Sequence, residues 1–148
     1  MRLKPARATM NIYFAGSIRG GRAEQTRYCE IVEQLKQYGR VLTEHVSAAE
    51  LSTQGERATD QEIHDRDLDW LRAADCLVAE VTTPSLGVGY EIGKATEWGK
   101  PVLCLFRVGS AHMLSAMIAG SSNVSVRAYE HTAELNEIFA AFFGGASG

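Results

Sequence analysis

The chain has 148 residues, of which 18 are acidic and 15 basic, so its net charge is −3. Hydrophobic residues make up 45% and charged residues 22%, which is typical of one globular domain with a proper core. The acidic surplus argues against a general nucleic-acid-binding protein, and no apolar run is long enough for a membrane span or a signal peptide. We therefore expect a cytoplasmic protein, small enough to enter the nucleus as well.

The elements predicted in chain order alternate between strands and helices. Apolar, β-branched runs predict strands at residues 11–15, 40–46, 76–81, 101–106 and 124–128. Helical periodicity predicts helices at residues 28–38, 63–74, 88–98, 113–118 and 135–142, and Gly39 is expected to cap the first of them. This alternation predicts an α/β fold, namely a Rossmann-like or flavodoxin-like three-layer sandwich with a five-stranded parallel sheet.

The ends of the chain and one internal stretch carry little pattern. Residues 1–9 and 144–148 are expected to be flexible tails around a single domain at 10–143, and residues 47–60 to form a surface loop or a short helix. The three cysteines are odd in number and lack CxxC spacing, so we expect small buried hydrophobes in a reducing compartment. The histidines lack metal-ligand spacing, and we expect neither a metal nor a cofactor.

The first strand-to-helix turn, at residues 16–21, has the features of a phosphate site. Its glycines expose backbone amides, Ser17 offers a hydroxyl and Arg19 a guanidinium, and a helix N-terminus follows. The turn is not a P-loop, because the Lys-Ser/Thr pair is missing, and it lacks the G-x-G-x-x-G pattern of a dinucleotide fingerprint. A tight connection with a surface arginine would produce the same pattern.

Asp67 is the one inward-facing aspartate of three on the predicted helix at 63–74. At 100° per residue it shares a face with Ile63 and Leu71, whereas Asp65 and Asp69 point away. A carboxylate on a buried face is costly unless it is paired or used. It could equally well bond a neighbouring backbone, so the pattern alone leaves its role open.

Glu91 follows a turn at residues 81–90 that bears Ser85, Gly87 and Gly89, at the carboxyl end of a predicted strand. Open α/β sheets bind ligands at this end of their strands. Placed in the first helical turn, Glu91 is expected to be permanently charged, although such acids are also common as mere dipole partners. Together with Asp67 and a phosphate turn, it indicates cleavage of a glycosidic bond in a phosphorylated sugar.

Other residues have two interpretations each. Tyr13, on the first strand, could donate a hydrogen bond to the nucleophile or could be a core aromatic residue. His45 could contact a base, or it could be a structural hydrogen-bonding residue. An apolar patch around Ser115 indicates either ordinary core or a subunit interface; its members are Met113, Leu114, Met117 and Ile118.

Several stretches, in one order, closely resemble the 2′-deoxynucleoside 5′-phosphate N-hydrolase family, part of the wider nucleoside 2-deoxyribosyltransferase group. The resemblance covers residues 11 to 143. It rests on residues 13–21, 41–46, 63–68, 78–82, 84–91 and 104–107, which include YFAGSIRGG, IHDRDL and PSLGVGYE. The resemblance implies a Rossmann-like fold and hydrolysis of 2′-deoxynucleoside 5′-monophosphates to a free base and 2-deoxyribose 5-phosphate.

The resemblance also assigns roles. Glu91 matches the nucleophile that forms a covalent intermediate, Asp67 the acid that assists departure of the base, and Tyr13 a supporting tyrosine. Ser115 matches a serine that reaches the substrate from the other subunit, which implies a homodimer with composite active sites. No nucleic-acid or membrane partner is expected. The expected substrate-binding residues are Gly16, Ser17, Ile18, Arg19, Gly20, His45, Ser85, Gly87, Gly89 and Ser115.

Ser85 separates two branches of this group. Transferases that act on unphosphorylated nucleosides carry an aspartate at the matching position, which would repel a 5′-phosphate, whereas serine can donate a hydrogen bond to it. The alternatives that stay open are a nucleoside 2-deoxyribosyltransferase and a nucleotide-binding regulator without turnover.

Overall fold

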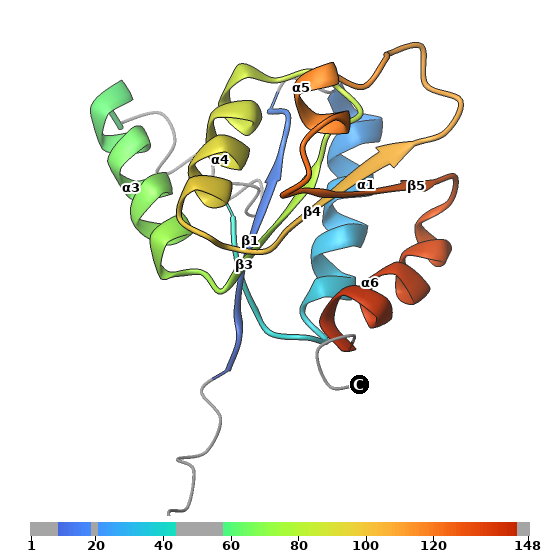
Figure 1. Cartoon of the computed structure of the whole chain (residues 1–148), viewed down its shortest axis with the longest axis horizontal. Coiled ribbons are helices and arrows are strands. Elements are labelled where there is room, and N and C mark those ends of the chain that lie inside the picture. Colours follow the sequence, from blue (N-terminus) through green and yellow to red (C-terminus); the bar gives the residue numbers. More distant parts are fainter. Residues whose placement is uncertain (1–8, 19–20, 44–57, 145–148) are drawn as a thin grey trace, which may run out of the picture.

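A computed structural model describes residues 9–18, 21–43 and 58–144, which form one sheet with helices on both faces (Figure 1). The strands are β1 (Asn11–Gly16), β2 (Arg40–Leu42), β3 (Cys76–Glu80), β4 (Val102–Arg107) and β5 (Ser125–Tyr129). All neighbours pair in parallel, in the order β2-β1-β3-β4-β5. The predicted five-stranded parallel sheet is therefore confirmed.

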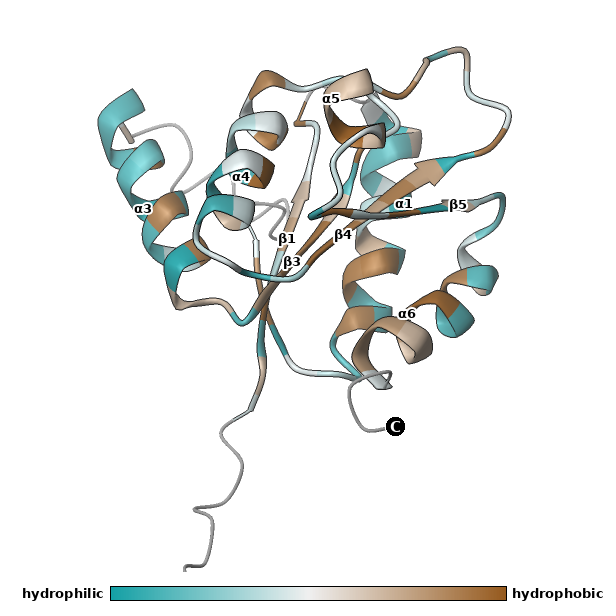
Figure 2. Cartoon of the chain, viewed as in Figure 1, coloured by the Kyte–Doolittle hydropathy of each residue, from teal (hydrophilic) through white to brown (hydrophobic). Residues whose placement is uncertain are grey.

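Two helical layers cover this sheet. The helices are α1 (Gly21–Leu35), α3 (Asp60–Ala73), α4 (Leu86–Glu97), α5 (Ala116–Ala119) and α6 (Leu135–Gly144), with a 3-10 turn at Thr132–Glu134. Side chains alternate along each strand, so Ile12 and Phe14 pack with α1 and α6 whereas Tyr13 and Ala15 pack with α3 and α4. Hydrophobic residues accordingly run along the central strands, while α3 is largely hydrophilic (Figure 2).

The predicted cap at Gly39 is wrong. Helix α1 ends at Leu35, a turn follows, and Gly39 does not have a positive φ. This residue has a different steric role, because a Cβ placed on it would lie 2.3 Å from the carbonyl oxygen of Met10. Arg40 donates its amide to that same oxygen at 2.8 Å, so the glycine permits the close approach that starts the pairing of β2 with β1.

Helices α3 and α4 both begin before their hydrophobic pattern does. Thr59 caps α3 by accepting a hydrogen bond from the amide of Glu62, and Ser85 caps α4 by accepting one from the amide of Val88. The glycines of the first turns of α4 are poor helix formers, which hid this start in the sequence. Glu91 is consequently the sixth residue of α4 and lies beyond its first turn.

All three cysteines are free, with Cys76 and Cys104 buried in the sheet and Cys29 exposed. Among the described residues, no group of three His, Cys, Asp or Glu side chains could hold a metal ion. No helix in the described part of the chain is both long and apolar enough to span a bilayer.

Candidate active site

Three side chains from three elements lie close together on the face of the sheet that α3 and α4 cover. Tyr13 of β1 is fully buried, and its hydroxyl donates a short hydrogen bond to Oε2 of Glu91 on α4. Asp67 of α3 is 7% exposed and Glu91 6%. Because Tyr13 belongs to a central strand, it fixes one oxygen of Glu91 relative to the sheet. The prediction that Asp67 faces inward is confirmed, and Asp65 and Asp69 are exposed as expected.

The expectation that Glu91 is permanently charged is wrong. Burial raises the pKa of Glu91 to about 7, the hydrogen bond from Tyr13 lowers it, and the nearby carboxylate of Asp67 raises it. The position of Glu91 explains the difference. The helix dipole is strongest in the first turn, and Glu91 lies beyond that turn and packs against the sheet. A carboxyl group poised near neutral pH loses its proton readily and is only weakly solvated, as a buried nucleophile requires.

Asp67 has a cationic neighbour that the sequence did not reveal. Arg66 approaches Oδ1 of Asp67 through Nε at 3.1 Å and Nη2 at 3.0 Å. The same guanidinium lies over the ring of Trp70, 4.8 Å from its centroid. In the sequence, an arginine next to a buried acid looks like an ordinary surface charge. The contact between its side chain and the neighbouring Asp67 is visible only in the structure.

A cavity of about 390 Å³ opens beside the two carboxylates. Its walls come mostly from α3 and α4, and Ile18 of the first turn joins them. His64 and Tyr90 link the two helices, with Nε2 of His64 3.1 Å from the Tyr90 hydroxyl. Apolar walls with acids at one side suit a flat ring attached to a sugar. The lining residues are Ile18, Asp60, Ile63, His64, Asp67, Leu68, Gly87, Tyr90 and Glu91.

His64 and Tyr90 were not singled out as site residues from the sequence. Their spacing carries a signal in hindsight, because His64 precedes Asp67 by one helical turn and Tyr90 adjoins Glu91.

A second cavity, of about 530 Å³, lies on the other side of the start of α4. Ser85, Gly89 and Ser115 line it together with apolar residues that include Met113 and Met117. Each serine oxygen accepts a backbone amide, from Val88 or Met117, and each hydroxyl can still donate its proton. Here Ser115 shares a cavity with Ser85 of its own chain.

The apolar patch is only partly core, because Ile118 packs against the buried cluster whereas Met113 and Met117 are exposed. Met113 is 90% exposed, Met117 83%, and the neighbouring Leu86 96%. The helix predicted at 113–118 is also shorter and later, at Ala116–Ala119.

The first turn lies beside the cavity that contains the carboxylates. Gly16 ends β1, Ser17 is buried, and Ile18 is exposed and lines that cavity. A Cβ on Gly16 would come within 3.0 Å of the Tyr28 ring, so only glycine lets this ring pack beneath the turn. Arg19, Gly20 and His45 lie outside the described residues.

Comparisons with known proteins show the family to which this chain is similar. The family model described as nucleoside 2-deoxyribosyltransferase matches residues 12–137. The 5-hydroxymethyl-dUMP N-hydrolase of Mus musculus is 61% identical over 117 residues, covering 78% of this chain and 68% of the mouse protein. The protein of the same name from Esox lucius is 51% identical over 144 residues, covering 93% and 99%.

One solved structure shares the fold at low sequence identity. The CMP N-glycosidase BcmB of Clostridium botulinum superposes with a TM-score of 0.64 at 18% identity, covering 89% of this chain and 98% of that one.

Proposed function

Because the chain belongs to the nucleoside 2-deoxyribosyltransferase family, we propose that it hydrolyses the N-glycosidic bond of 2′-deoxynucleoside 5′-monophosphates. The products are a free nucleobase and 2-deoxyribose 5-phosphate. The observation that carries this proposal is the buried Glu91, bonded by Tyr13, beside Asp67 at the edge of a cavity. No cofactor takes part in the proposed reaction.

In the proposed mechanism, the ionised carboxylate of Glu91 attacks the anomeric carbon. The bond from that carbon to the base nitrogen breaks as a bond to a Glu91 oxygen forms, and Asp67 assists protonation of the departing base. Water then attacks the same carbon, releases Glu91 and leaves 2-deoxyribose 5-phosphate. Two carboxyl groups in a retaining reaction lie roughly 5–5.5 Å apart, with the second one handling protons.

Tyr13 and Arg66 orient the two acids in this mechanism. Tyr13 holds Oε2 of Glu91, which fixes the direction in which Oε1 points. Arg66 contacts only Oδ1 of Asp67, so Oδ2 is the oxygen that we assign to proton transfer. A 2′-hydroxyl would crowd these side chains, which accounts for selection of the 2′-deoxy sugar.

The 5′-phosphate is proposed to bind between the first turn and the start of α4. Ser85 caps α4 through its oxygen and can donate its hydroxyl proton to a phosphate oxygen, next to the positive end of a helix of 12 residues. Ser17 and Arg19 of the first turn are assigned to the phosphate from the sequence. His45 is assigned to the base, on the sequence alone.

We further propose a homodimer in which the exposed apolar patch is the subunit interface. Met113, Met117 and Leu86 are too exposed for a monomer to leave them uncovered without cost. In such a dimer Ser115 reaches the partner's substrate, as the family resemblance implies. The cytoplasm, and also the nucleus, is the proposed location.

The direct test is a panel of deoxynucleoside monophosphates, matching ribonucleotides and unphosphorylated nucleosides. Released base is followed by chromatography, with Glu91→Ala as the inactive control. Base release from deoxynucleoside monophosphates alone is the expected result. If none of the monophosphates releases base, the proposal is wrong.

Ser85 allows a sharper test of the phosphate. Asp and Asn both cap helices well, so Ser85→Asp and Ser85→Asn both preserve the start of α4. Only the aspartate repels a phosphate, and we expect it to raise KM for the monophosphate roughly tenfold or more relative to the asparagine variant. Equal KM values in the two variants would place the phosphate elsewhere.

A deoxyribosyltransferase is the second candidate, because the matching family model carries that description. An acceptor base added to the reaction separates the two activities. A new nucleotide that contains this base indicates transfer, whereas an unchanged yield of 2-deoxyribose 5-phosphate indicates hydrolysis. A regulator without turnover would bind the monophosphates equally well in wild type and in Glu91→Ala, and neither protein would release base.

A further inference from the structure

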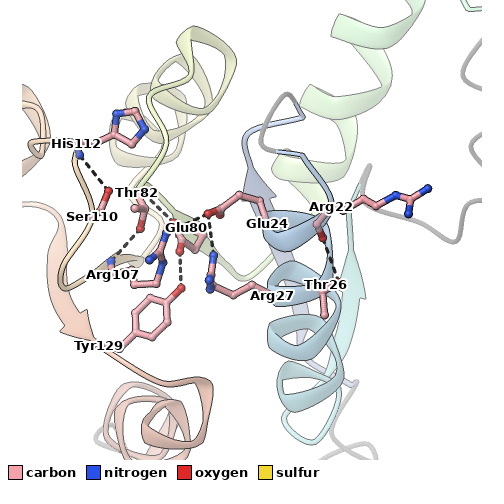
Figure 3. A network of polar contacts seen from close by, with 10 residues as sticks. All are labelled: Arg22, Glu24, Thr26, Arg27, Glu80, Thr82, Arg107, Ser110, His112 and Tyr129. Carbon is pink, nitrogen blue, oxygen red and sulfur yellow. Dashed lines mark hydrogen bonds and ion pairs between the residues drawn. The ribbon is translucent and has the colours of Figure 1, made fainter.

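A second cluster of buried polar side chains lies on the opposite face of the sheet, at the ends of β3, β4 and β5 (Figure 3). Its centre is Glu80, which is fully buried. Oε1 of Glu80 accepts the backbone amide of Thr82 at 2.7 Å, and Oε2 accepts a short hydrogen bond from the Tyr129 hydroxyl. The two oxygens thus tie the end of β3 to the loop that follows it and to β5.

The cluster continues through Thr82 and Arg107 to helix α1. The hydroxyl oxygen of Thr82, itself 1% exposed, accepts the backbone amide of Arg107 at 2.8 Å. The Arg107 guanidinium reaches Oε1 of Glu24 at 3.2 Å, and Arg27 contacts the same oxygen at 2.7 Å. Glu24 lies in the first turn of α1, directly after the turn that begins at Ser17.

This chain of contacts connects the two segments that we assign to the phosphate. One end is the start of α1. The other is Thr82, only three residues before Ser85, the cap of α4. Pro84, whose φ is fixed, is one of the two residues between them. Because this short link has little conformational freedom, a displacement of Thr82 should also displace Ser85.

Glu80 is an unusual choice for a purely structural site. A carboxyl group without solvent access is costly, and hydrophobic residues of similar volume often stabilise such positions better. Burial also raises the pKa of Glu80. What an apolar residue cannot provide is two directed acceptors, one for the loop and one for β5.

We propose that Glu80 is a positioning residue that, through Thr82 and Arg107, holds the β3–α4 loop in register with the start of α1, so that both segments face one phosphate. The role rests on the proposed function, because it concerns the phosphate of the same substrate. Glu80 itself touches neither of the two cavities through which we expect substrate to bind.

The test uses two conservative variants, because each removes one group from the cluster and leaves Glu80 in place. Thr82→Val removes the acceptor for Arg107, and Tyr129→Phe removes one donor to Glu80. The matched controls are Thr96→Val and Tyr38→Phe. The Thr96 hydroxyl donates to the Gly93 carbonyl within α4, and the Tyr38 ring packs on aromatic rings of α6. All four variants lose one hydroxyl group, but only the first two lose it from the cluster.

The measured quantity is the ratio kcat/KM for a deoxynucleoside monophosphate, with kcat and KM determined separately. We expect Thr82→Val and Tyr129→Phe to lower this ratio roughly tenfold, through KM for the monophosphate, and both controls to leave it unchanged. The double variant should lower the ratio by less than the product of the single effects, because both changes act through Glu80. A lower melting temperature with an unchanged ratio would overturn the proposal.

Binding of 2-deoxyribose 5-phosphate, measured by calorimetry, separates this inference from the proposed function. Roughly tenfold weaker binding in both cluster variants supports positioning even if wild type releases no base. Unchanged affinity overturns the positioning role even if wild type is an active hydrolase.

Discussion

Two buried glutamates, Glu91 and Glu80, each accept a short hydrogen bond from a tyrosine hydroxyl, on opposite faces of the same sheet. Burial raises the pKa of both. Their surroundings differ. The second oxygen of Glu80 accepts the Thr82 amide, whereas Glu91 lines a cavity. The same pair of groups therefore has a structural role where the protein bonds both carboxylate oxygens, and a reactive role where the carboxylate lines a cavity that can hold a ligand.

The largest expected difference between the two is in turnover. Glu91→Gln should lower kcat roughly 10³-fold or more, because the amide cannot form the glycosyl ester. Glu80→Gln, its matched counterpart, should keep kcat within about tenfold of wild type, since it acts through position alone. Steady-state kinetics at saturating monophosphate measures both variants. Equal losses in the two would erase the distinction drawn above.

Glu91→Gln also has an expected effect on stability with a definite sign. The pKa of Glu91 in the folded protein is about 7, above the ordinary value of 4.5, so its ionisation destabilises the fold as pH rises between these values. Relative to wild type, the glutamine variant should gain up to about 3 kcal/mol of unfolding free energy from pH 4.5 to 8. Urea unfolding at both pH values checks this, and a gap that shrinks with pH would contradict it.

Removing the hydroxyl of Tyr129 or of Tyr13 should separate an effect on stability from an effect on activity. Tyr129→Phe leaves Oε2 of the fully buried Glu80 without its donor, which should lower the free energy of unfolding by about 1–3 kcal/mol. Tyr13→Phe should lower stability less, because water in the cavity can replace the hydroxyl, but should lower kcat roughly tenfold or more. Denaturant titration and kinetics on the same preparations compare them, and the reverse pattern would exchange the roles of the two pairs.

The pH profile tests the reactive pair alone. Because Glu91 must be ionised to attack, kcat/KM should rise with pH through an apparent pKa near 7. The hydrogen bond from Tyr13 lowers the pKa of Glu91, so Tyr13→Phe should move this limb to higher pH. A limb that stays in place would mean that another group controls it.

The smallest expected effect concerns two arginines on α3. Arg66 contacts Asp67 and stacks on Trp70, whereas Arg72 stacks on Trp98, 4.3 Å from the ring centroid, away from the two carboxylates. Arg66→Met should lower kcat roughly two- to fivefold, as expected from a partly exposed ion pair of under about 1 kcal/mol. Arg72→Met should leave kcat unchanged. Equal rates in both variants would remove Arg66 from the site.

The sequence was sufficient for the order of the elements and for the inward face of α3, because regular patterns encode both. Alternation of strands and helices predicted the parallel sheet, and the period of 100° per residue turned Asp67 inward and its two neighbours outward. It failed where the outcome depends on contacts between distant segments. Neither the charge of Glu91 nor the bonds of Glu80 has a local signature, because their partners lie 78 and 49 residues away.

The predictions of where helices start and end were wrong for a reason that involves glycine. Gly87 and Gly89 concealed the first turns of α4, and Gly39 looked like a cap although it is needed for a backbone contact.

The glycines of α4 have a consequence for how the protein can evolve. A Cβ on Gly89 or Gly93 would meet nothing within 4 Å, and one on Gly87 only the Ser85 hydroxyl oxygen at 3.8 Å. Alanine at each position would therefore fit and add about 1 kcal/mol of helix stability. Gly87 and Gly89 each line a cavity and Gly93 lines neither. The gain is thus open to selection at Gly93, whereas at the other two it would fill space that a substrate needs, so improved stability and retained function exclude one another there.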